Sequence, residues 1–337
     1  MPNGFRIDLA EIGFLGADLK RPECVLCTPD GSVLTSDWGG GVAILDAQGR
    51  QRRLLGTSGG PKYGLLPNGF GLCRDGSLLL AHLNDQEGGV WRLDPHGRLS
   101  PFLLELDGMP LPPTNFVLVD GSDRVWITVS TRLLPRFPAR RPDLADGYVI
   151  LVDSHGARIV ADGFGFTNEL RLDASGEWLY VVETFGRRIT RLRVSKDGAL
   201  SSRETYVELG PGTFPDGIAF DVQGGLWIAS IVSNRILRVA PDRSIAMVVE
   251  DHDPVHLAEF ERDFTSGRLA GLPPEPPPAR TLGNTSSLAF GGPDLKTVYV
   301  GCLLAGRIAR FRSPVAGLPM AHWHAGTLHP SLVPPIT

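Results

Sequence analysis

Six polar residues recur along the chain, and each stands at the start of a short apolar stretch. They are Glu23, Asn68, Asn115, Asn168, Asp216 and Ser286, at intervals of 45, 47, 53, 48 and 70 residues. If these side chains converge on one point, the two carboxylates repel each other unless a cation lies between them. All six side chains carry oxygen atoms. Because oxygen ligands suit Ca²⁺ or Mg²⁺ better than a soft metal, the set predicts a site for a hard divalent cation.

A simpler explanation covers part of this pattern. Asn, Asp and Ser favour turns, so they often precede a strand for that reason alone. That preference accounts for one or two of the six residues. It does not account for Glu23, nor for the repetition in equivalent places. Ca²⁺ binds about 6–8 oxygens, so waters or a substrate oxygen would have to complete its coordination.

The segments that would position these residues also repeat. Each polar residue is followed by an apolar strand, a tight turn and a second apolar strand, as in residues 214–220 and 226–230. Periods near 45 residues with several short strands are typical of a β-propeller with one blade per repeat. We therefore expect an all-β, six-bladed β-propeller with four-stranded antiparallel blades, as a single domain over residues 1–337. Residues 5–15 are expected to form the outer strand of the last blade and so close the ring.

Two connections, 131–146 and 251–280, are too long for hairpin loops. In an up-and-down blade, the loop that enters the first strand and the loop that leaves the second lie on one face. This is also the face of the six polar residues, at the mouth of the channel. Long loops in compact domains are usually functional lids or disordered linkers, and we expect lids here. His252, His256 and Glu259 in the second connection are expected to be solvated rather than catalytic.

Composition limits the partners and the compartment. The net charge is −4 without a basic run, so nucleic acid and anionic membrane are not expected as partners. The first residues lack the apolar core of a signal peptide, and no stretch approaches the roughly 18 apolar residues of a membrane span. Cys24 and Cys27, three apart in an apolar strand, are expected to be packed thiols rather than a zinc or redox pair. A small-molecule substrate and a cytoplasmic location are the resulting expectations.

The ends of the second strands should also face the pocket, and two of them carry ionisable groups. His82 could bind substrate or move a proton near neutral pH, and it could equally anchor the neighbouring loop. Glu183 could act behind the metal ligands or form a hydrogen bond between blades. With Asn68, Asn115 and Ser286, these two residues form the predicted substrate-binding set.

The chain resembles the SMP-30/gluconolactonase/LRE family of six-bladed propellers, which includes the diisopropylfluorophosphatase-like enzymes. The resemblance covers nearly the whole chain and rests on Pro22-Glu23, Thr167-Asn168, Phe214-Pro215-Asp216-Gly217-Ile218 and residues 288–300. It implies that Glu23, Asn168 and Asp216 bind a divalent metal, with Asn115 as a fourth ligand or a substrate contact. It also implies that Asp216 is the general base or nucleophile. Ca²⁺ is the first expectation for the cation, with Mg²⁺, Mn²⁺ or Zn²⁺ as alternatives.

The chain departs from the family pattern at two places. Pro113 and Thr114 precede Asn115, where the sugar lactonases usually carry an Arg, and Glu169 stands where Gly is usual. That Arg is an expected partner of sugar hydroxyl groups. Its absence favours a less polar substrate, as do five phenylalanines expected near the mouth: Phe116, Phe164, Phe166, Phe185 and Phe214.

The resulting prediction is a divalent-metal-dependent hydrolase of a lactone or related ester. The metal would polarise the carbonyl group, with Asp216 as base or nucleophile. A phosphotriesterase of the diisopropylfluorophosphatase type is one alternative, and a propeller that binds a ligand or protein without catalysis is another. The carboxylates argue against a strictosidine synthase-like propeller.

Overall fold

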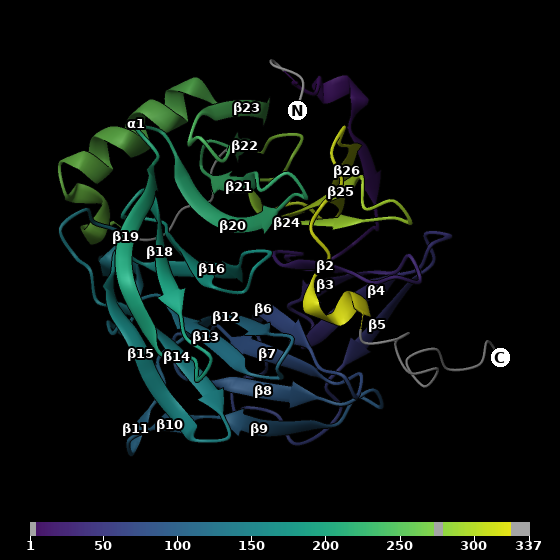
Figure 1. The fold of residues 1–337 in the computed structure, drawn as a ribbon, viewed down its shortest axis with the longest axis vertical. Coiled ribbons are helices and arrows are strands. Elements are labelled where there is room, and N and C mark those ends of the chain that lie inside the picture. The colour runs from purple at the N-terminus through teal and green to yellow at the C-terminus, as the bar shows by residue number, and fades with distance from the viewer. Residues whose placement is uncertain (1–4, 273–278, 325–337) are drawn as a thin grey trace.

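The structure, a computed structural model, describes residues 5–272 and 279–324. Within these residues, six four-stranded antiparallel sheets surround a common axis (Figure 1). This arrangement confirms the predicted six-bladed β-propeller. No helix in the described part of the chain is long and apolar enough to cross a membrane.

Each blade runs from an innermost strand to an outermost one. The innermost strands are β2 (Val25–Cys27), β6 (Pro67–Leu72), β12 (Thr114–Val119), β16 (Thr167–Leu172), β20 (Phe214–Phe220) and β24 (Thr285–Gly291). The second strands are β3 (Val33–Asp37), β7 (Leu78–His82), β13 (Val125–Val129), β17 (Trp178–Glu183), β21 (Leu226–Ile231) and β25 (Thr297–Cys302). The third strands are β4 (Gly41–Leu45), β8 (Val90–Leu93), β14 (Gly147–Asp153), β18 (Arg188–Val194), β22 (Arg235–Val239) and β26 (Ile308–Arg312). The outermost strands are β5 (Gln51–Leu55), β9 (Leu99–Leu103), β15 (Gly156–Phe164), β19 (Leu200–Glu208), β23 (Ile245–Glu250) and β1 (Gly13–Leu15).

The ring is closed by strands from both ends of the chain. Gly13 of β1 lies opposite Arg310 of β26, and Leu15 lies opposite Ile308, as expected for the outer strand of the last blade. The strand is shorter than the sequence predicts. Its predicted first part contains the 3₁₀ turn η1 (Leu9–Glu11), because Asp8 and Glu11 form a reciprocal cap that ends strand geometry.

Buried indole rings anchor two of the blades from within. Trp126 and Trp227 are fully buried, and each donates a hydrogen bond of 2.9 Å to an aspartate in the preceding turn, Asp120 and Asp221 respectively.

Two cysteines, Cys24 just before the first innermost strand and Cys27 at its end, are also buried. Cys24 and Cys27 pack into different hydrophobic clusters, as odd spacing on a strand requires. Both are free thiols.

The described parts of the two long connections form a cap. We call these connections the first insertion (131–146) and the second insertion (251–280). The first contains the 3₁₀ turn η2 (Phe137–Ala139). The second contains helix α1 (Pro254–Thr265) and the 3₁₀ turn η3 (Arg268–Gly271), although no helical pattern was predicted there. The α1 helix begins at Pro254 because the Asp253 side chain caps it by accepting from the Val255 and His256 backbone N–H groups. Prolines 273, 274 and 276–278 of the second insertion lie outside the described residues.

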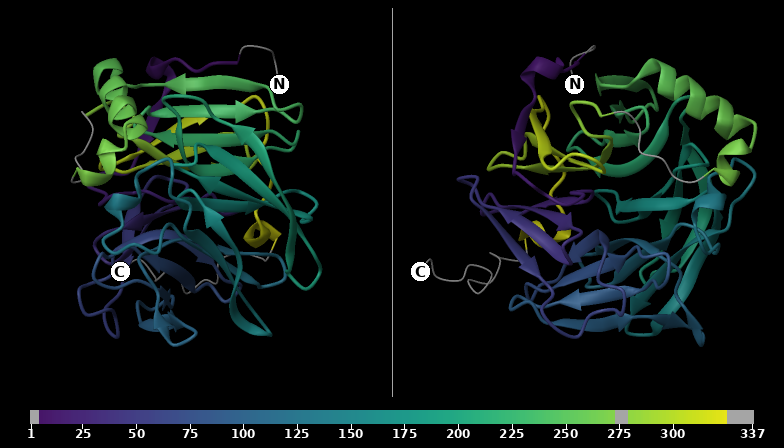
Figure 2. Two further views of the ribbon diagram at one scale, coloured as in Figure 1. Left: turned by 90° about the vertical axis from the view of Figure 1, so that its left-hand side faces the viewer. Right: turned by 180° about the vertical axis from the view of Figure 1, so that it is seen from behind.

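The cap and the end of the described chain lie on opposite faces. The left view of Figure 2 shows α1 at one face of the ring and the 3₁₀ turn η4 (Ala321–His324) at the other. The Arg140 guanidinium of the first insertion donates to the Leu269 carbonyl of the second at 3.2 Å, so the two insertions contact each other. A small hairpin of β10 (Glu105–Leu106) and β11 (Met109–Pro110) completes the elements.

Candidate functional site

The predicted polar residues leave the regular strand ladder at the mouth of the ring. In five innermost strands the register shifts at that residue, for example between Pro67 and Phe70 and between Pro215 and Ile218. Such a bulge leaves a residue unpaired and redirects its side chain. Glu23 lies just before β2. All six residues are at most 6 % exposed.

Direct hydrogen bonds join four of the six residues. The Asn68 amide group donates to the Glu23 carboxylate at 2.9 Å and to the Asn115 carbonyl oxygen at 3.0 Å. The Ser286 hydroxyl donates to the Glu23 carbonyl oxygen at 2.8 Å. Asp216 lies close enough to Glu23 for the negative charge of Glu23 to raise the pKa of Asp216. The Asn168 amide nitrogen donates to the Thr184 hydroxyl at 3.1 Å, so the Asn168 side-chain oxygen takes no part in that bond.

Three buried oxygens in this set have no hydrogen-bond partner. They are Glu23 Oε2, Asn115 Oδ1 and Asn168 Oδ1, and they come from three blades. Buried acceptors without a partner are rare in proteins and costly, so a missing group is the ordinary explanation. These oxygens belong to three of the four predicted metal ligands, and they fit an oxygen-binding cation. No cluster of three or more His, Cys, Asp or Glu in the described chain could hold a metal, so a cation here would depend on the asparagine oxygens.

Burial also makes the carboxyl groups of the site reluctant to ionise. Loss of water raises the pKa of Glu23 to about 7 and that of Asp216 well above its usual range. The nearby charge of Glu169 adds to both shifts, and the guanidinium groups of Arg21 and Arg136 oppose them. A cation bound between these groups would stabilise their ionised forms.

Glu169, where the family usually has Gly, forms a buried ion pair next to the site. Its carboxylate lies 2.9 Å from the Arg171 guanidinium and accepts a hydrogen bond of 2.6 Å from the Ser287 hydroxyl. Gly217, next to Asp216, lies so close that an added Cβ would stand 2.6 Å from the Ser286 carbonyl oxygen. Only glycine allows this approach, so the Asp-Gly pair of β20 is fixed by packing as well as by chemistry.

Sequence reasoning missed two arginines at the mouth. Arg21 donates to the Asn68 side-chain oxygen at 2.7 Å and lies 3.8 Å from the free oxygen of Glu23. Arg136 comes from the first insertion and lies 4.0 Å from Asp85. Arg21 stands two residues before Glu23, which was an available signal. The position of the Arg136 side chain depends on the path of the first insertion. The sequence repeats do not specify that path.

Two predicted substrate contacts are occupied by other partners in the structure. The His82 ring is fully buried, its Nδ1 accepts from the Leu66 backbone N–H at 3.1 Å, and burial lowers its pKa. Glu183 accepts hydrogen bonds from Arg188 at 2.8 Å and from the Gly165 N–H at 2.7 Å. Both residues thus hold neighbouring loops in place. Whether either one binds substrate stays a prediction.

Four of the five phenylalanines expected at the mouth are buried, and Phe166 is partly buried. Phe185 and Phe214 form a hydrophobic cluster with Phe264 of the second insertion, and Phe166 packs against it. Phe116 lies under the Arg171 guanidinium, 4.6 Å from it. The contacts with Phe264 dock the cap onto the blades, so Phe185 and Phe214 give no support for a less polar substrate. In the second insertion, Glu259 is exposed and His252 pairs with Glu250 at 3.2 Å.

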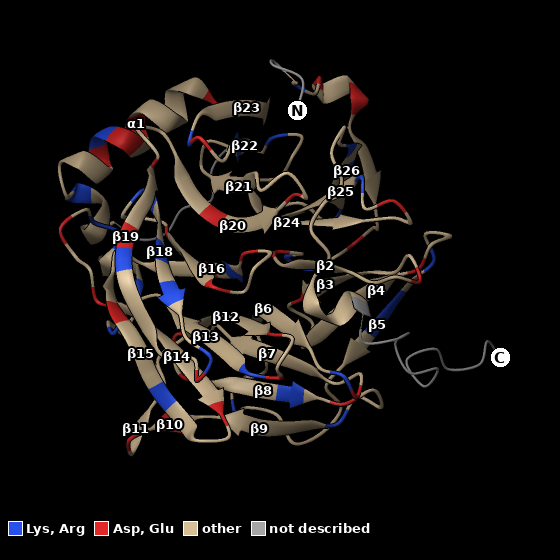
Figure 3. Cartoon of the chain, in the orientation of Figure 1, with Lys and Arg blue, Asp and Glu red and all other residues tan. Residues whose placement is uncertain are grey.

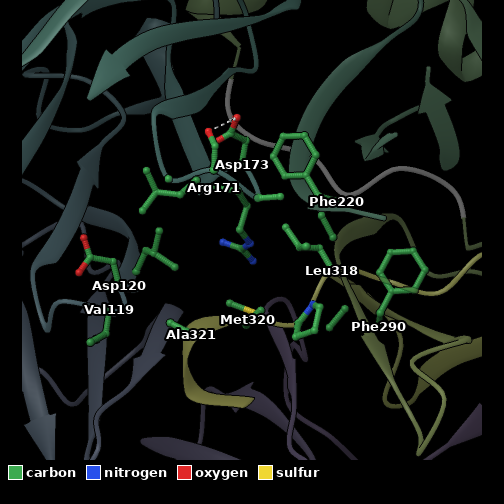
Figure 4. Close-up of a pocket in the computed structure, with 18 of the residues that line it drawn as sticks. Val119, Asp120, Arg171, Asp173, Phe220, Phe290, Leu318, Met320 and Ala321 are labelled. Carbon is green, nitrogen blue, oxygen red and sulfur yellow. Dashed lines mark hydrogen bonds between the residues drawn. The ribbon is translucent and has the colours of Figure 1, made fainter. Parts of the chain in front are cut away.

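A separate cavity of about 450 Å³ lies at the other ends of the innermost strands. Its walls include Leu118, Phe220 and Phe290 from those strand ends, and Leu318 and Met320 from the C-terminal segment. Figure 4 shows the Arg171 side chain projecting among these residues. None of the six predicted site residues lines this cavity, so the candidate site is the mouth on the cap side.

Comparison with known proteins gives the family. The family described as the SMP-30/gluconolactonase/LRE-like region matches residues 21–250. The chain belongs to this family.

Two characterised relatives and one solved structure are similar to this member. A 6-deoxy-6-sulfogluconolactonase from Pseudomonas putida is 29% identical over 235 residues, covering 68% of this chain and 67% of that protein. The pentonolactonase XacC from Haloferax volcanii is 29% identical over 238 residues, covering 69% of this chain and 65% of that protein. A calcium-binding protein, regucalcin, from Agrobacterium tumefaciens matches in structure with a TM-score of 0.66 and 17% identity, over 95% of this chain and 98% of that one. At that identity, the likeness concerns the fold alone.

Proposed function

We propose that the protein hydrolyses a lactone with the help of a divalent cation bound at the cap-side mouth. The observation that carries this proposal is the set of partnerless buried oxygens on Glu23, Asn115 and Asn168 beside Asp216. Two relatives support the substrate class, because both are named as lactonases. One acts on a sulfonated lactone by its name and the other on a pentonolactone, so the names leave the substituents of the substrate open.

Glu23, Asn115, Asn168 and Asp216 would hold the cation. Their oxygens suit Ca²⁺ first, and one solved structure with this fold is described as a calcium-binding protein. A cation bound there would supply positive charge to the substrate carbonyl oxygen. Asn68 would position Glu23, since its amide group donates to one carboxylate oxygen and leaves the other free.

Asp216 would act as the general base. Its carboxylate accepts a proton from water, whose oxygen adds to the lactone carbonyl carbon. The ring C–O bond then breaks, the ring oxygen takes the proton back, and the product is a hydroxy acid. Burial raises the pKa of Asp216 in the cation-free site, and a cation bound to this carboxylate would oppose that shift. Direct attack by Asp216 on the carbonyl carbon is the alternative role for the same group.

A chelator experiment tests the proposal. The purified protein is stripped of metal and assayed on glucono-, pentono- and γ-butyrolactones and on a phosphotriester, before and after addition of Ca²⁺, Mg²⁺, Mn²⁺ or Zn²⁺. We expect lactone hydrolysis that is lost with the metal and restored by it. The same cation should raise the midpoint of thermal unfolding, because it binds only the folded state. Hydrolysis of the phosphotriester alone would favour the phosphotriesterase alternative, and activity that survives chelation would contradict metal dependence.

A further inference from the structure

The Arg136 guanidinium lies beside the candidate site and has no close hydrogen-bond or ion-pair partner among the described residues. Among the described residues its side chain makes no hydrogen bond, and the carboxylate of Asp85 lies 4.0 Å away. Asp85 is 57% exposed, and such an exposed, distant pair contributes little to stability. By contrast, Arg140 on the same insertion donates to the carbonyl oxygens of Phe137, Leu269 and Leu272. The insertion thus uses Arg140 to hold itself in place and leaves Arg136 available.

Arg21 places a second positive charge at the same mouth. Its guanidinium is held by the Asn68 side-chain oxygen at 2.7 Å and lies 4.4 Å from the centre of the Trp38 ring. Loss of water and repulsion from Arg21 lower the pKa of Arg136 to about 10. The Arg136 guanidinium therefore remains protonated at neutral pH, and it lies within electrostatic range of Arg21 and of Glu23.

The net charge of the site would change when a divalent cation binds Glu23 and Asp216 in their ionised forms. Three carboxylates (Glu23, Glu169 and Asp216) face three guanidinium groups (Arg21, Arg136 and Arg171) in the described part of the chain. Arg171 is taken by Glu169, at 2.9 Å. A divalent cation on Glu23 and Asp216 would cancel their charges and leave Arg21 and Arg136 in excess. The loaded site would then carry a surplus of positive charge, reduced at its rim only by the exposed Asp85.

Neutral hydrogen-bonding groups at the mouth are largely used up. Both ends of the Asn68 amide are bonded, to Arg21, Glu23 and Asn115. The Ser286 hydroxyl donates to the Glu23 carbonyl oxygen. His82 and Glu183 hold loops. Two neutral ring N–H groups at the mouth, His82 Nε2 and Trp38 Nε1, have no partner, but both atoms are fully buried. Among the described residues at the mouth, the guanidinium of Arg136 is the partly exposed donor left for a substrate.

We infer that the substrate is a lactone with a second, anionic group, such as a carboxylate, sulfonate or phosphate, and that Arg136 binds this group. The inference rests on the proposed lactonase function and adds its substrate class. It makes Arg136 a specificity-determining residue, supplied by the first insertion. A guanidinium fork binds the paired oxygens of such groups through charge-assisted hydrogen bonds.

Paired lactones test the role of Arg136. We would measure kcat and KM on glucono-δ-lactone, which is neutral, and on its 6-phospho, 6-sulfo and glucaro counterparts. For Arg136→Gln we expect KM to rise about 10- to 100-fold on the anionic lactones, the value of one charge-assisted hydrogen bond, with kcat within about twofold. On the neutral lactone the KM should change less than about threefold. Arg136→Lys should recover part of the loss, and Arg141→Gln, at an exposed arginine paired with Asp143, should change neither. The three anionic arms show which anion is preferred.

Binding of the product acids gives a readout that needs no turnover. Calorimetry on the metal-loaded protein should show glucarate or 6-phosphogluconate binding at least about tenfold more tightly than gluconate, and Arg136→Gln should abolish that difference. Equal losses on neutral and anionic lactones would overturn the inference, because Arg136 would then act on a group common to both. Equal binding of gluconate, glucarate and 6-phosphogluconate would overturn it as well. If the parent hydrolyses no lactone, the proposed function fails, and the calorimetry alone decides whether the mouth prefers a second anion.

Discussion

At the scale of single residues, Asp216 is the group whose loss should separate binding from chemistry. The Asn side chain in Asp216→Asn keeps one ligand oxygen and nearly the same volume, but it cannot accept the proton of the attacking water. Cation affinity should fall, with some occupancy retained through Glu23, Asn115 and Asn168. We expect kcat to fall by ~10²–10⁴-fold, the usual loss for a general base, even at saturating Ca²⁺.

Asn68→Ala is the comparison for that experiment. Asn68 bonds to Glu23 and Asn115 and carries none of the free oxygens, so its loss should affect substrate affinity more than cation affinity. If Asp216→Asn turns over lactone near the parent rate with saturating cation, Asp216 is only a ligand. The base would then have to be sought at Glu23, His82 or Glu183.

A buried histidine, His82, and a partly buried one, His322, should make the fold sensitive to acid. Burial lowers the pKa of His82 and His322 below the ordinary value of 6.5. The unfolded chain therefore binds more protons than the folded one below that pH, and stability falls as pH drops through 6.5. His322 contacts the Cys27 carbonyl oxygen at 2.8 Å. In His322→Gln, thermal unfolding should show a smaller decrease in midpoint from pH 7.5 to pH 5 than in the parent. His96→Gln, at an exposed position, should keep the parent's pH dependence, and an unchanged slope in His322→Gln would contradict the argument.

The sequence predicts the residues of the site better than their surroundings. Glu23, Asn115, Asn168 and Asp216 recur in equivalent places of a repeat, so their convergence follows from the fold. Arg136 belongs to no repeat, and nothing in its neighbours specifies where the insertion carries it. Phe185 and Phe214 were expected near the mouth, but their burial depends on α1, which packs against them through Leu257 and Phe264.

At the scale of elements, the blades were predictable and the cap was not. Each blade repeats turn, strand and strand, and period-2 patterns specify such elements locally. The α1 helix had a weaker signal in Asp253-Pro254 and in the apolar positions 257, 260 and 264, which fall on one helical face. The Pro-rich remainder of the insertion concealed that signal.

The contact between the two insertions should control the order of the cap. Arg140→Ala removes the hydrogen bonds from the first insertion to the Leu269 and Leu272 carbonyl groups. We expect backbone hydrogen exchange in residues 254–272 to become at least about tenfold faster, while the midpoint of global unfolding changes by less than about 2 °C. If the cap acts as a lid, kcat/KM should fall as well. Arg141→Ala, next along the chain and exposed, is the matched control, and protection equal to the parent in Arg140→Ala would refute the role of this contact.

At the scale of the whole molecule, the ring brings segments that are distant in the sequence to one point at its centre. Other charged residues are distributed over the outer surface. Figure 3 shows acidic and basic residues interspersed over the outer strands and loops. The four proposed cation ligands come from the first, third, fourth and fifth blades. A bound cation would therefore link blades that share no strand pairing, and its effect should appear as stability of the ring.

Closure of the ring should depend on the short strand β1. It is the outer strand of the last blade, and it covers the edge of β26. The preceding segment adds buried Ile7 and Ile12, and the Ile7 N–H donates to Val248 of the fifth blade at 2.8 Å. Removal of residues 1–15 takes away these side chains and exposes an unpaired strand edge, which favours association between molecules.

We expect this truncation to lower the midpoint of thermal unfolding by roughly 5–10 °C, from the lost apolar burial spread over a chain of this length. Light scattering below the midpoint should increase, because the open edge of β26 can pair with another molecule. Phe14→Ala, which keeps the backbone pairing with Ala309, should lower the midpoint by a smaller amount and leave the scattering unchanged. An unchanged midpoint after truncation would mean that the other five blades and three strands of the sixth hold the ring without closure. Scattering that rises equally in Phe14→Ala would trace association to the lost side chain instead of the strand edge.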